Sequence, residues 1–181
     1  METWADNHVE FEGKVVRLRI GHVYLDNGEL GYREVVEHAG GVCVIPYTGD
    51  SVVLIRQFRI ACNQYLIEAP AGKIEGDEDP EIRGSLELEE ETGYKAGRLI
   101  SAGKIFPTVG FCSEIIHLYL AFDLVKTQQN LETEEQIEVI EMSLDEVEQS
   151  LREHRFIDGK TALGLHRLLM YLAEENSDLK V

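Results

Sequence analysis

The chain has 181 residues, of which 44% are apolar and 28% are charged, so it is long enough to bury a core without disulfides or a structural metal. Its 34 acidic residues against 17 Lys and Arg give a net charge of −17, the wrong sign for a protein that binds DNA or RNA mainly through phosphates. The sequence contains no apolar run of the roughly 20 residues that cross a bilayer, and residues 1–10 lack the features of a secretory signal. We expect a cytoplasmic protein that binds neither nucleic acid nor membranes.

The first part of the chain is predicted to form an antiparallel sheet. Residues 14–20 and 30–36 show near alternation of apolar and polar positions, as in half-buried strands. Between them lies Asn27-Gly28, a dipeptide typical of a tight hairpin turn. This stretch therefore indicates a β-meander.

Gly40-Gly41 interrupts the alternating pattern and marks a boundary near His38. We expect residues 1–38 to form a small N-terminal sheet and residues 39–181 to form the main domain. A meander of this size has too little apolar surface to be stable alone, so packing on a neighbouring chain is physically reasonable.

The main domain alternates predicted strands and helices. The apolar runs at residues 42–46 and 51–58 suit strands of a buried sheet. Asp79 and Pro80 begin a helix, because Asp caps helices and Pro is tolerated at the first helical position, and Gly93 ends it. The remaining predictions are loops at residues 69–72 and 131–136, strands around residue 105 and at 115–122 and 139–142, and helices at 144–155 and 161–175. The order predicts an α+β or α/β fold.

Cysteine and histidine give little indication of chemistry. Cys43, Cys62 and Cys112 are an odd number without CxxC spacing, which argues against both a disulfide framework and a zinc site. We interpret them as small buried or half-buried thiols. The six histidines lack metal-ligand spacing and are interpreted as structural or exposed.

The most informative stretch is residues 72–94, where acidic side chains greatly outnumber Lys73 and Arg83. On a helix, Glu87, Glu90 and Glu91 share one face, because they are separated by three and four residues. Such carboxylates repel one another, and Mg²⁺ or Mn²⁺ resolves the conflict by binding oxygen ligands. A solvated acidic surface is the alternative interpretation.

The spacing of this stretch resembles the Nudix box: Gly, five residues, Glu, seven residues, then Arg-Glu-apolar-any-Glu-Glu-any-Gly-apolar. The matching residues are Gly72, Glu78, Glu87, Leu88, Glu90, Glu91, Gly93 and Tyr94. Leu86 stands where the family has an arginine that helps to position the glutamates. Arg83 lies one helical turn before Glu87 and is a possible compensation, since it can pair with that carboxylate.

The resemblance extends over nearly the whole chain. Residues 32–38, 53–59 and 68–72 are similar to segments of the ADP-ribose and nucleoside-diphosphate-sugar pyrophosphatases, as are residues 110–114 and 158–161. It implies an α+β Nudix fold, an α/β/α sandwich with a mixed sheet between helices and a small N-terminal antiparallel sheet. It also implies a homodimer in which the N-terminal sheet reaches over the partner.

The implied reaction is Mg²⁺-dependent hydrolysis of the pyrophosphate bond of a nucleoside diphosphate sugar, with Mn²⁺ as a possible substitute. The family pattern implies Glu87, Glu91 and the Ala71 carbonyl as metal ligands, and Glu90 as a further ligand or an acid-base group. A glutamate of the acidic loop then completes the site or activates the water. Glu135 is the first choice and Glu134 the second.

Three residues are expected to bind the substrate. Arg59 would contact the pyrophosphate or the terminal sugar, because a guanidinium forks onto phosphate oxygens. Glu68 would accept hydrogen bonds from a sugar or fix Arg59. Tyr32 is favoured over Trp4 and Tyr47 as the aromatic side chain that stacks on the base.

Several functions stay open at this point. Val109 occupies the position of a proline that marks ADP-ribose enzymes, which leaves GDP-mannose and other nucleotide sugars as substrates. A Nudix hydrolase of a dinucleoside polyphosphate or coenzyme A is one alternative. Another is a catalytically impaired nucleotide-binding module that has lost activity through Leu86.

Overall fold

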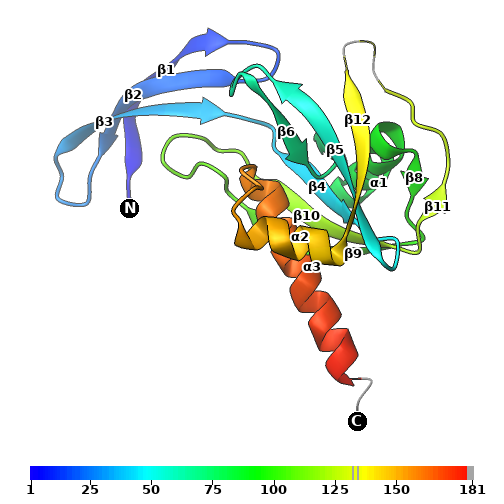
Figure 1. Cartoon of the computed structure of the whole chain (residues 1–181). Coiled ribbons are helices and arrows are strands. Elements are labelled where there is room, and N and C mark those ends of the chain that lie inside the picture. Colours follow the sequence, from blue (N-terminus) through cyan, green and yellow to red (C-terminus); the bar gives the residue numbers. More distant parts are fainter. Residues whose placement is uncertain (132, 134, 179–181) are drawn as a thin grey trace. The chain divides into compact units, whose positions relative to one another are not determined.

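The computed structural model describes residues 1–131, 133 and 135–178 (Figure 1). The chain divides into two compact units. The first comprises Met1–Gly40 and Phe106–Ile115, and the second comprises Gly41–Ile105 and Ile116–Val181.

The first unit is built on an antiparallel sheet of β1 (Thr3–Glu12), β2 (Arg17–Tyr24) and β3 (Leu30–Glu37). The predicted hairpin between β2 and β3 is confirmed, and the Gly28 N–H donates to the Leu25 carbonyl at 2.9 Å. The strand β1 was not predicted. Residues 106–115 join this unit through a bridge between Val36 and Cys112.

The second unit contains a four-stranded mixed sheet in the order β7-β4-β10-β9. Its centre is β4 (Gly41–Pro46), which runs parallel to β10 (Ile116–Phe122). On the outer sides, β7 (Ala71–Lys73) and β9 (Arg98–Ile105) pair antiparallel with them. The prediction of a mixed sheet is confirmed.

A second sheet has the order β12-β5-β6 and is antiparallel. It consists of β5 (Ser51–Arg59), β6 (Gln64–Glu68) and β12 (Ile137–Ser143). The short strands β8 (Tyr94–Lys95) and β11 (Val125–Lys126) form a separate pair. The end of β5 and the end of β6 carry Arg59 and Glu68, two of the predicted site residues.

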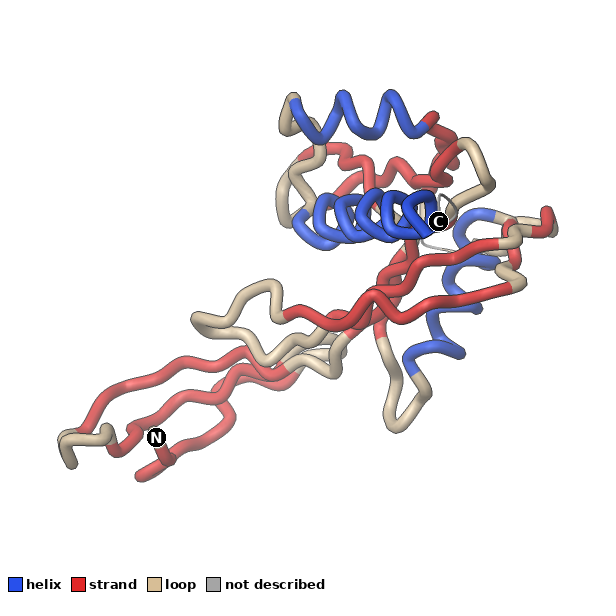
Figure 2. The backbone as a smooth tube through the Cα atoms, turned by 90° about the horizontal axis from the view of Figure 1, so that it is seen from below, coloured by secondary structure: helices blue, strands red, loops and turns tan. Residues whose placement is uncertain are grey.

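Helices cover both faces of the mixed sheet (Figure 2). On one face α1 (Pro80–Thr92) packs Leu88 against Val42 and Val44. On the other, α2 (Leu144–Arg152) and α3 (Gly159–Asp178) pack among the residues that surround Cys43 and Ile45. Alternate side chains of β4 thus enter two cores, which explains its uninterrupted apolar sequence. Within the described part of the chain, no helix has the length and apolar character needed to cross a membrane.

Several sequence predictions need correction. The strand predicted at 14–20 runs from Arg17 to Tyr24, and the helix predicted at 144–155 ends at Arg152. The loop predicted at residues 69–72 is wrong in its second half, because Ala71 and Gly72 lie in β7 and pair with β4. The expectation of buried or half-buried thiols holds for Cys43 and Cys112, whereas Cys62 is exposed in the turn between β5 and β6. The three residues of β7 show no strand pattern in the sequence, because this strand forms only through its pairing with the distant β4.

Candidate active site

The acidic helix α1 begins and ends where its sequence predicts. The Asp79 carboxylate accepts hydrogen bonds from the backbone N–H groups of Glu81 at 2.8 Å and Ile82 at 3.4 Å. Gly93 adopts a φ of 69° and donates its N–H to the Glu89 carbonyl, as expected of a glycine that ends a helix. These two caps fix the ends of the helix, and the packing of Leu88 with Val42 and Val44 sets its register against the sheet.

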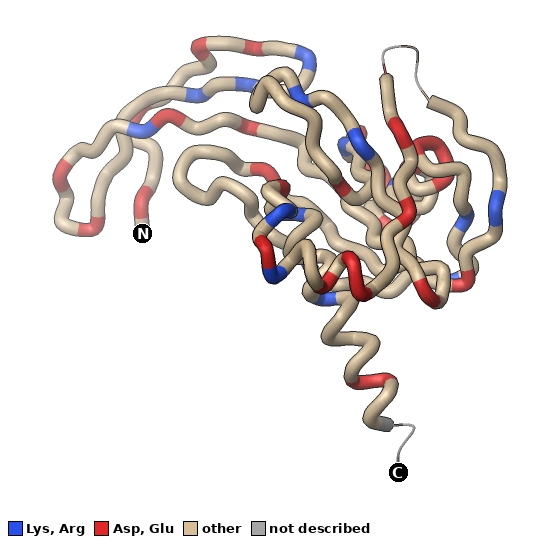
Figure 3. The backbone as a smooth tube through the Cα atoms, in the orientation of Figure 1, with Lys and Arg blue, Asp and Glu red and all other residues tan. Residues whose placement is uncertain are grey.

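The register turns two carboxylates inward against β7. Glu87 is 6% exposed and Glu91 is 3% exposed. Glu91 Oε2 accepts a hydrogen bond of 2.9 Å from the Ala71 N–H. A Cβ on Gly72 would lie 1.4 Å from Glu87 Oε1, so any larger residue there would displace this carboxylate. Figure 3 shows acidic residues gathered on α1.

Burial and mutual repulsion disfavour ionisation of these carboxyls. Burial raises the pKa of Glu91 to about 8, the Ala71 N–H lowers it, and the charges of Glu87 and Glu135 raise it further. Burial also raises the pKa of Glu87, against the lowering effect of its hydrogen bond from Arg83. Ionising both carboxyls would therefore be unfavourable unless a cation offset their charge.

Arg83 takes the position beside Glu87 that its spacing predicts. Its Nε donates to Glu87 Oε1 at 2.8 Å, its Nη2 contacts the same oxygen, and Nη2 lies 3.5 Å from Glu90 Oε2. Leu86, at the position of the missing box arginine, is 40% exposed. A guanidinium therefore reaches the carboxylates from one turn earlier in the helix.

The acidic loop is described in part. Glu134 lies outside the described residues, and its role stays a prediction. Glu135 is described, and its charge contributes to the raised pKa of both Glu87 and Glu91. The fold therefore brings Glu135 into electrostatic range of the acidic face of α1.

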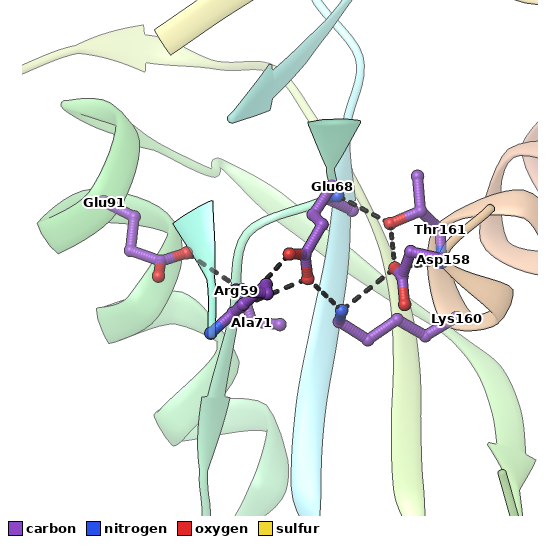
Figure 4. A network of polar contacts seen from close by, with 8 residues as sticks. Arg59, Glu68, Ala71, Glu91, Asp158, Lys160 and Thr161 are labelled. Carbon is purple, nitrogen blue, oxygen red and sulfur yellow. Dashed lines mark hydrogen bonds and ion pairs between the residues drawn. The ribbon is translucent and has the colours of Figure 1, made fainter. Parts of the chain in front are cut away.

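Arg59 and Glu68 form a pair beside this face (Figure 4). The Arg59 Nε and Nη2 atoms donate to the two oxygens of Glu68 at 2.7 and 3.1 Å. Burial would raise the pKa of Glu68, but the bonds and charges of Arg59 and Lys160 outweigh it and hold that pKa below its usual range. The charge of Arg59 also lowers the pKa of Glu91.

Tyr32 belongs to the first unit. It lies on β3, is 50% exposed and makes an edge contact with the His22 ring, with 5.6 Å between the centroids. Its role in base stacking stays a prediction.

Three site residues carried no role in the sequence analysis: Asp158, Lys160 and Thr161, at the start of α3. Lys160 Nζ contacts Glu68 Oε2 and lies 2.9 Å from Asp158 Oδ2. The Thr161 hydroxyl donates to Asp158 and accepts a 2.8 Å hydrogen bond from the Ala69 N–H. Their segment was noted for its resemblance, but contacts between residues so distant in sequence have no local signal.

The donor chemistry fits a divalent cation. Glu87 and Glu91 lie against β7, and Glu90 Oε2 lies 3.5 Å from the Nη2 atom of the same Arg83 that binds Glu87. Within the described part of the chain, no three Asp, Glu, His or Cys side chains are already arranged as a metal site, so a cation would have to draw these carboxylates together. Hard cations such as Mg²⁺ and Mn²⁺ prefer oxygen ligands. Burial raises the pKa of both Glu87 and Glu91 in spite of the lowering effects of Arg83 and Arg59, so a further cation would stabilise their ionised forms.

Comparisons with known proteins bear on the family and the fold. A NUDIX domain model matches residues 37–162. A methanol dehydrogenase activator of Bacillus methanolicus is 39% identical over 161 residues, and an ADP-ribose pyrophosphatase of Bacillus subtilis is 36% identical over the same length; each alignment covers 87% of both chains. A GDP-mannose pyrophosphatase of Cronobacter sakazakii is 37% identical over 147 residues, 75% of this chain and 76% of that protein. The crystal structure of an ADP compounds hydrolase matches the fold with a TM-score of 0.85 at 18% identity, covering 96% of this chain and 95% of that one. The α+β fold is confirmed.

Proposed function

The chain belongs to the NUDIX family, and we propose that it hydrolyses the pyrophosphate bond of nucleoside diphosphate sugars of the ADP-ribose or GDP-mannose type. The products are a nucleoside monophosphate and a sugar phosphate. Relatives named as pyrophosphatases of both substrates support this proposal.

One observation carries the proposal. Glu87 and Glu91 are buried against β7, where Gly72 leaves room for the Glu87 carboxylate and the Ala71 N–H donates a hydrogen bond to Glu91. Two buried, repelling carboxylates destabilise a fold unless a cation offsets them. A surface selected only for solubility would leave such side chains in water, so their burial favours a metal site.

The metal proposed is Mg²⁺, with Mn²⁺ as a substitute, held by Glu87, Glu90, Glu91 and the Ala71 carbonyl. When bound, such a cation neutralises pyrophosphate charge and lowers the pKa of water. Arg83 keeps the Glu87 carboxylate in place. Arg59 donates to a phosphate oxygen from the edge of its guanidinium that does not face Glu68.

The proton of the attacking water needs an acceptor. We assign it to a carboxylate of the acidic loop, with Glu135 first and Glu134 second, and Glu90 as a further acid-base group. The electrostatic effect of Glu135 on Glu87 and Glu91 supports this assignment. A loop base can approach the reaction centre when the substrate binds.

The test is a substrate panel. The purified protein with Mg²⁺ meets ADP-ribose, GDP-mannose, UDP-glucose, a diadenosine polyphosphate and coenzyme A separately, and a phosphatase releases phosphate from the products. Glu91→Gln serves as the inactive variant, and Glu89→Gln on the same helix serves as its control. We expect turnover of nucleotide sugars that Glu91→Gln abolishes and Glu89→Gln keeps.

Other outcomes would replace the proposal. Turnover confined to the diadenosine polyphosphate or coenzyme A would assign another NUDIX substrate. Binding of nucleotide sugars without turnover, with Mn²⁺ as well as Mg²⁺, would favour a binding module whose catalysis is lost through Leu86.

A homodimer is also proposed, with the sheet of residues 1–38 packed on a second copy of the chain. Support comes from several large apolar side chains of this sheet that are exposed: Phe11 is 56%, Tyr24 52% and Leu30 59% exposed. An exposed apolar area of this kind marks an interaction surface. Light scattering on the protein as it elutes from a size-exclusion column should give twice the chain mass, and the double substitution Phe11→Asp and Leu30→Asp should shift the measured mass toward that of the monomer.

The cytoplasmic location stays a prediction.

A second candidate function comes from the relative named as a methanol dehydrogenase activator. The chain would then stimulate a dehydrogenase. Adding it to methanol dehydrogenase, with and without the Glu91→Gln substitution, tests this candidate. Stimulation that survives Glu91→Gln would show that the effect does not need the proposed hydrolysis.

A further inference from the structure

A chain of charged side chains runs behind Arg59 into the interior (Figure 4). Glu68 is 2% exposed and accepts hydrogen bonds from Arg59 through both oxygens. Lys160, whose side chain is 14% exposed, contacts Glu68 Oε2 from the other side. Glu68 therefore lies between two cations, one of which is directed toward the proposed substrate site.

Lys160 is itself held in position by Asp158. The distance from Lys160 Nζ to Asp158 Oδ2 is 2.9 Å. Asp158 also accepts a hydrogen bond of 3.0 Å from the Thr161 N–H and another from the Thr161 hydroxyl, so it caps the start of α3. Hydrogen bonds at the start of the helix already offset part of the Asp158 charge. Asp158 therefore does not neutralise Lys160 completely, and Lys160 can also compensate Glu68.

The same helix start is joined to the segment that leads into β7, the strand of the proposed metal site. The Ala69 N–H donates to the Thr161 hydroxyl at 2.8 Å, and two residues later the Ala71 N–H donates to Glu91. The segment that carries Glu68, Ala69 and Ala71 is therefore fixed to α3 at one point and to α1 at another. Lys160 lies at the point where this segment, α3 and Arg59 meet.

Charge sharing gives Lys160 a role in binding. If Arg59 were its only partner, the buried Glu68 carboxylate would neutralise most of the guanidinium charge and would draw the guanidinium toward the protein interior. With Lys160 on its second side, Glu68 is compensated twice. The guanidinium of Arg59, with 37% of its side chain exposed, then retains positive potential on its outer edge.

We propose that Lys160 is a positioning residue that shares the charge of Glu68 and so keeps Arg59 directed at an anionic diphosphate. This inference rests on the proposed function, since it names the group that sets affinity for the pyrophosphate. Lys160 does not touch substrate in this proposal. Its effect passes through Glu68 to Arg59.

The test is a double-mutant cycle of Lys160→Met and Arg59→Ala. KM and kcat are measured with the best nucleotide sugar of the panel, and the dissociation constant is measured with α,β-methylene-ADP-ribose, which cannot be cleaved at its diphosphate. Lys104→Met, which removes a lysine charge at a distant position on β9, is the control. Thermal denaturation checks that each variant folds.

We expect Lys160→Met to raise KM and the dissociation constant by about tenfold and to change kcat by less than about threefold. In the Arg59→Ala background, the same substitution should change either constant by less than about twofold, because coupled residues are not additive. Lys160→Arg, which keeps the cation, should restore most of the affinity.

Each other outcome is informative. Equal losses in both backgrounds, or a loss in kcat alone, would overturn the inference and leave the proposed function in place. A wild-type protein that cleaves no nucleotide sugar would overturn the proposed function, and the dissociation constants would still report on Lys160. If Lys160→Met does not fold, the comparison of Lys160→Arg with Lys160→Gln replaces it, and equal affinity in those two variants would overturn the inference.

Discussion

Neutralising Glu91 should stabilise the metal-free protein, and the gain should grow with pH. Its carboxyl is 3% exposed, and its pKa is raised from 4.5 to about 8 by burial and by the neighbouring carboxylates. In the unfolded chain the same group ionises near its ordinary pKa. The folded state therefore holds a proton that the unfolded state has lost over this pH range.

The sign and size follow from proton linkage. Below pH 4.5 Glu91 is protonated in both the folded and the unfolded chain, so it has no effect on the pH dependence of stability. Between pH 4.5 and about 8 the free energy of unfolding falls as pH rises. At about 1.4 kcal/mol per pKa unit, the full loss is of order 4 to 5 kcal/mol at high pH. For a chain of this length that corresponds to a melting temperature lower by about 10 °C or more.

The assay is calorimetric unfolding in a metal chelator at about pH 5, 7 and 9. Glu91→Gln removes the titrating group but keeps an oxygen that can accept from the Ala71 N–H. We expect this variant to match the wild type near pH 5 and to melt well above it near pH 9. Adding Mg²⁺ at the higher pH should stabilise the wild type and leave the variant nearly unchanged.

Glu89→Gln is the matched control, because it removes one acid from the same helix outside the buried pair. Parallel melting curves for wild type and Glu91→Gln across the pH range would refute the reasoning. So would an increase in stability of the wild type relative to Glu91→Gln as pH rises, since the raised pKa demands the opposite slope.

Three further predictions concern the reaction. Arg83→Ala should lower kcat by more than about tenfold. Adding Leu86→Arg to that variant should restore activity, whereas Leu86→Arg alone should change kcat little. An unchanged rate in Arg83→Ala would contradict a role for the Arg83–Glu87 pair. Gly72→Ala should reduce activity by about 100-fold or more, because its Cβ displaces the adjoining carboxylate; wild-type rates and an unchanged requirement for Mg²⁺ would show that the close contact is unimportant. Glu135→Gln should lower kcat by about 100-fold with little change in KM; loss of the same size in Glu138→Gln, on β12, would exclude a specific role for the loop carboxylate.

Local signals in the sequence predicted the acidic helix well. Asp79 with Pro80 and Gly93 define its ends through interactions within a few residues, and Arg83 reaches Glu87 across a single turn. Helix periodicity also placed the carboxylates on one face. These features depend on neighbours in sequence, so the sequence alone contains them.

Features that depend on distant pairing were missed. The strand β7 is short and includes glycine, so it was predicted as a loop, and only its pairing with β4 makes it a strand. The contact of Lys160 with Glu68 joins residues that are 92 positions apart. Without the fold, a lysine beside a helix start has no reason to be placed near a buried glutamate.

The parallel pairing of β4 with β10 has a consequence for how the chain folds. Gly41 is opposite Ile116, so this contact closes a loop that contains β5, α1 and β9. Closing such a loop costs entropy before the buried apolar contacts of β4 can offset it. The β2–β3 hairpin can form early, whereas the central sheet forms only after this long-range contact. Refolding should accordingly be slow for a chain of this size, and truncating Val44 should slow it more than truncating an exposed residue of the hairpin.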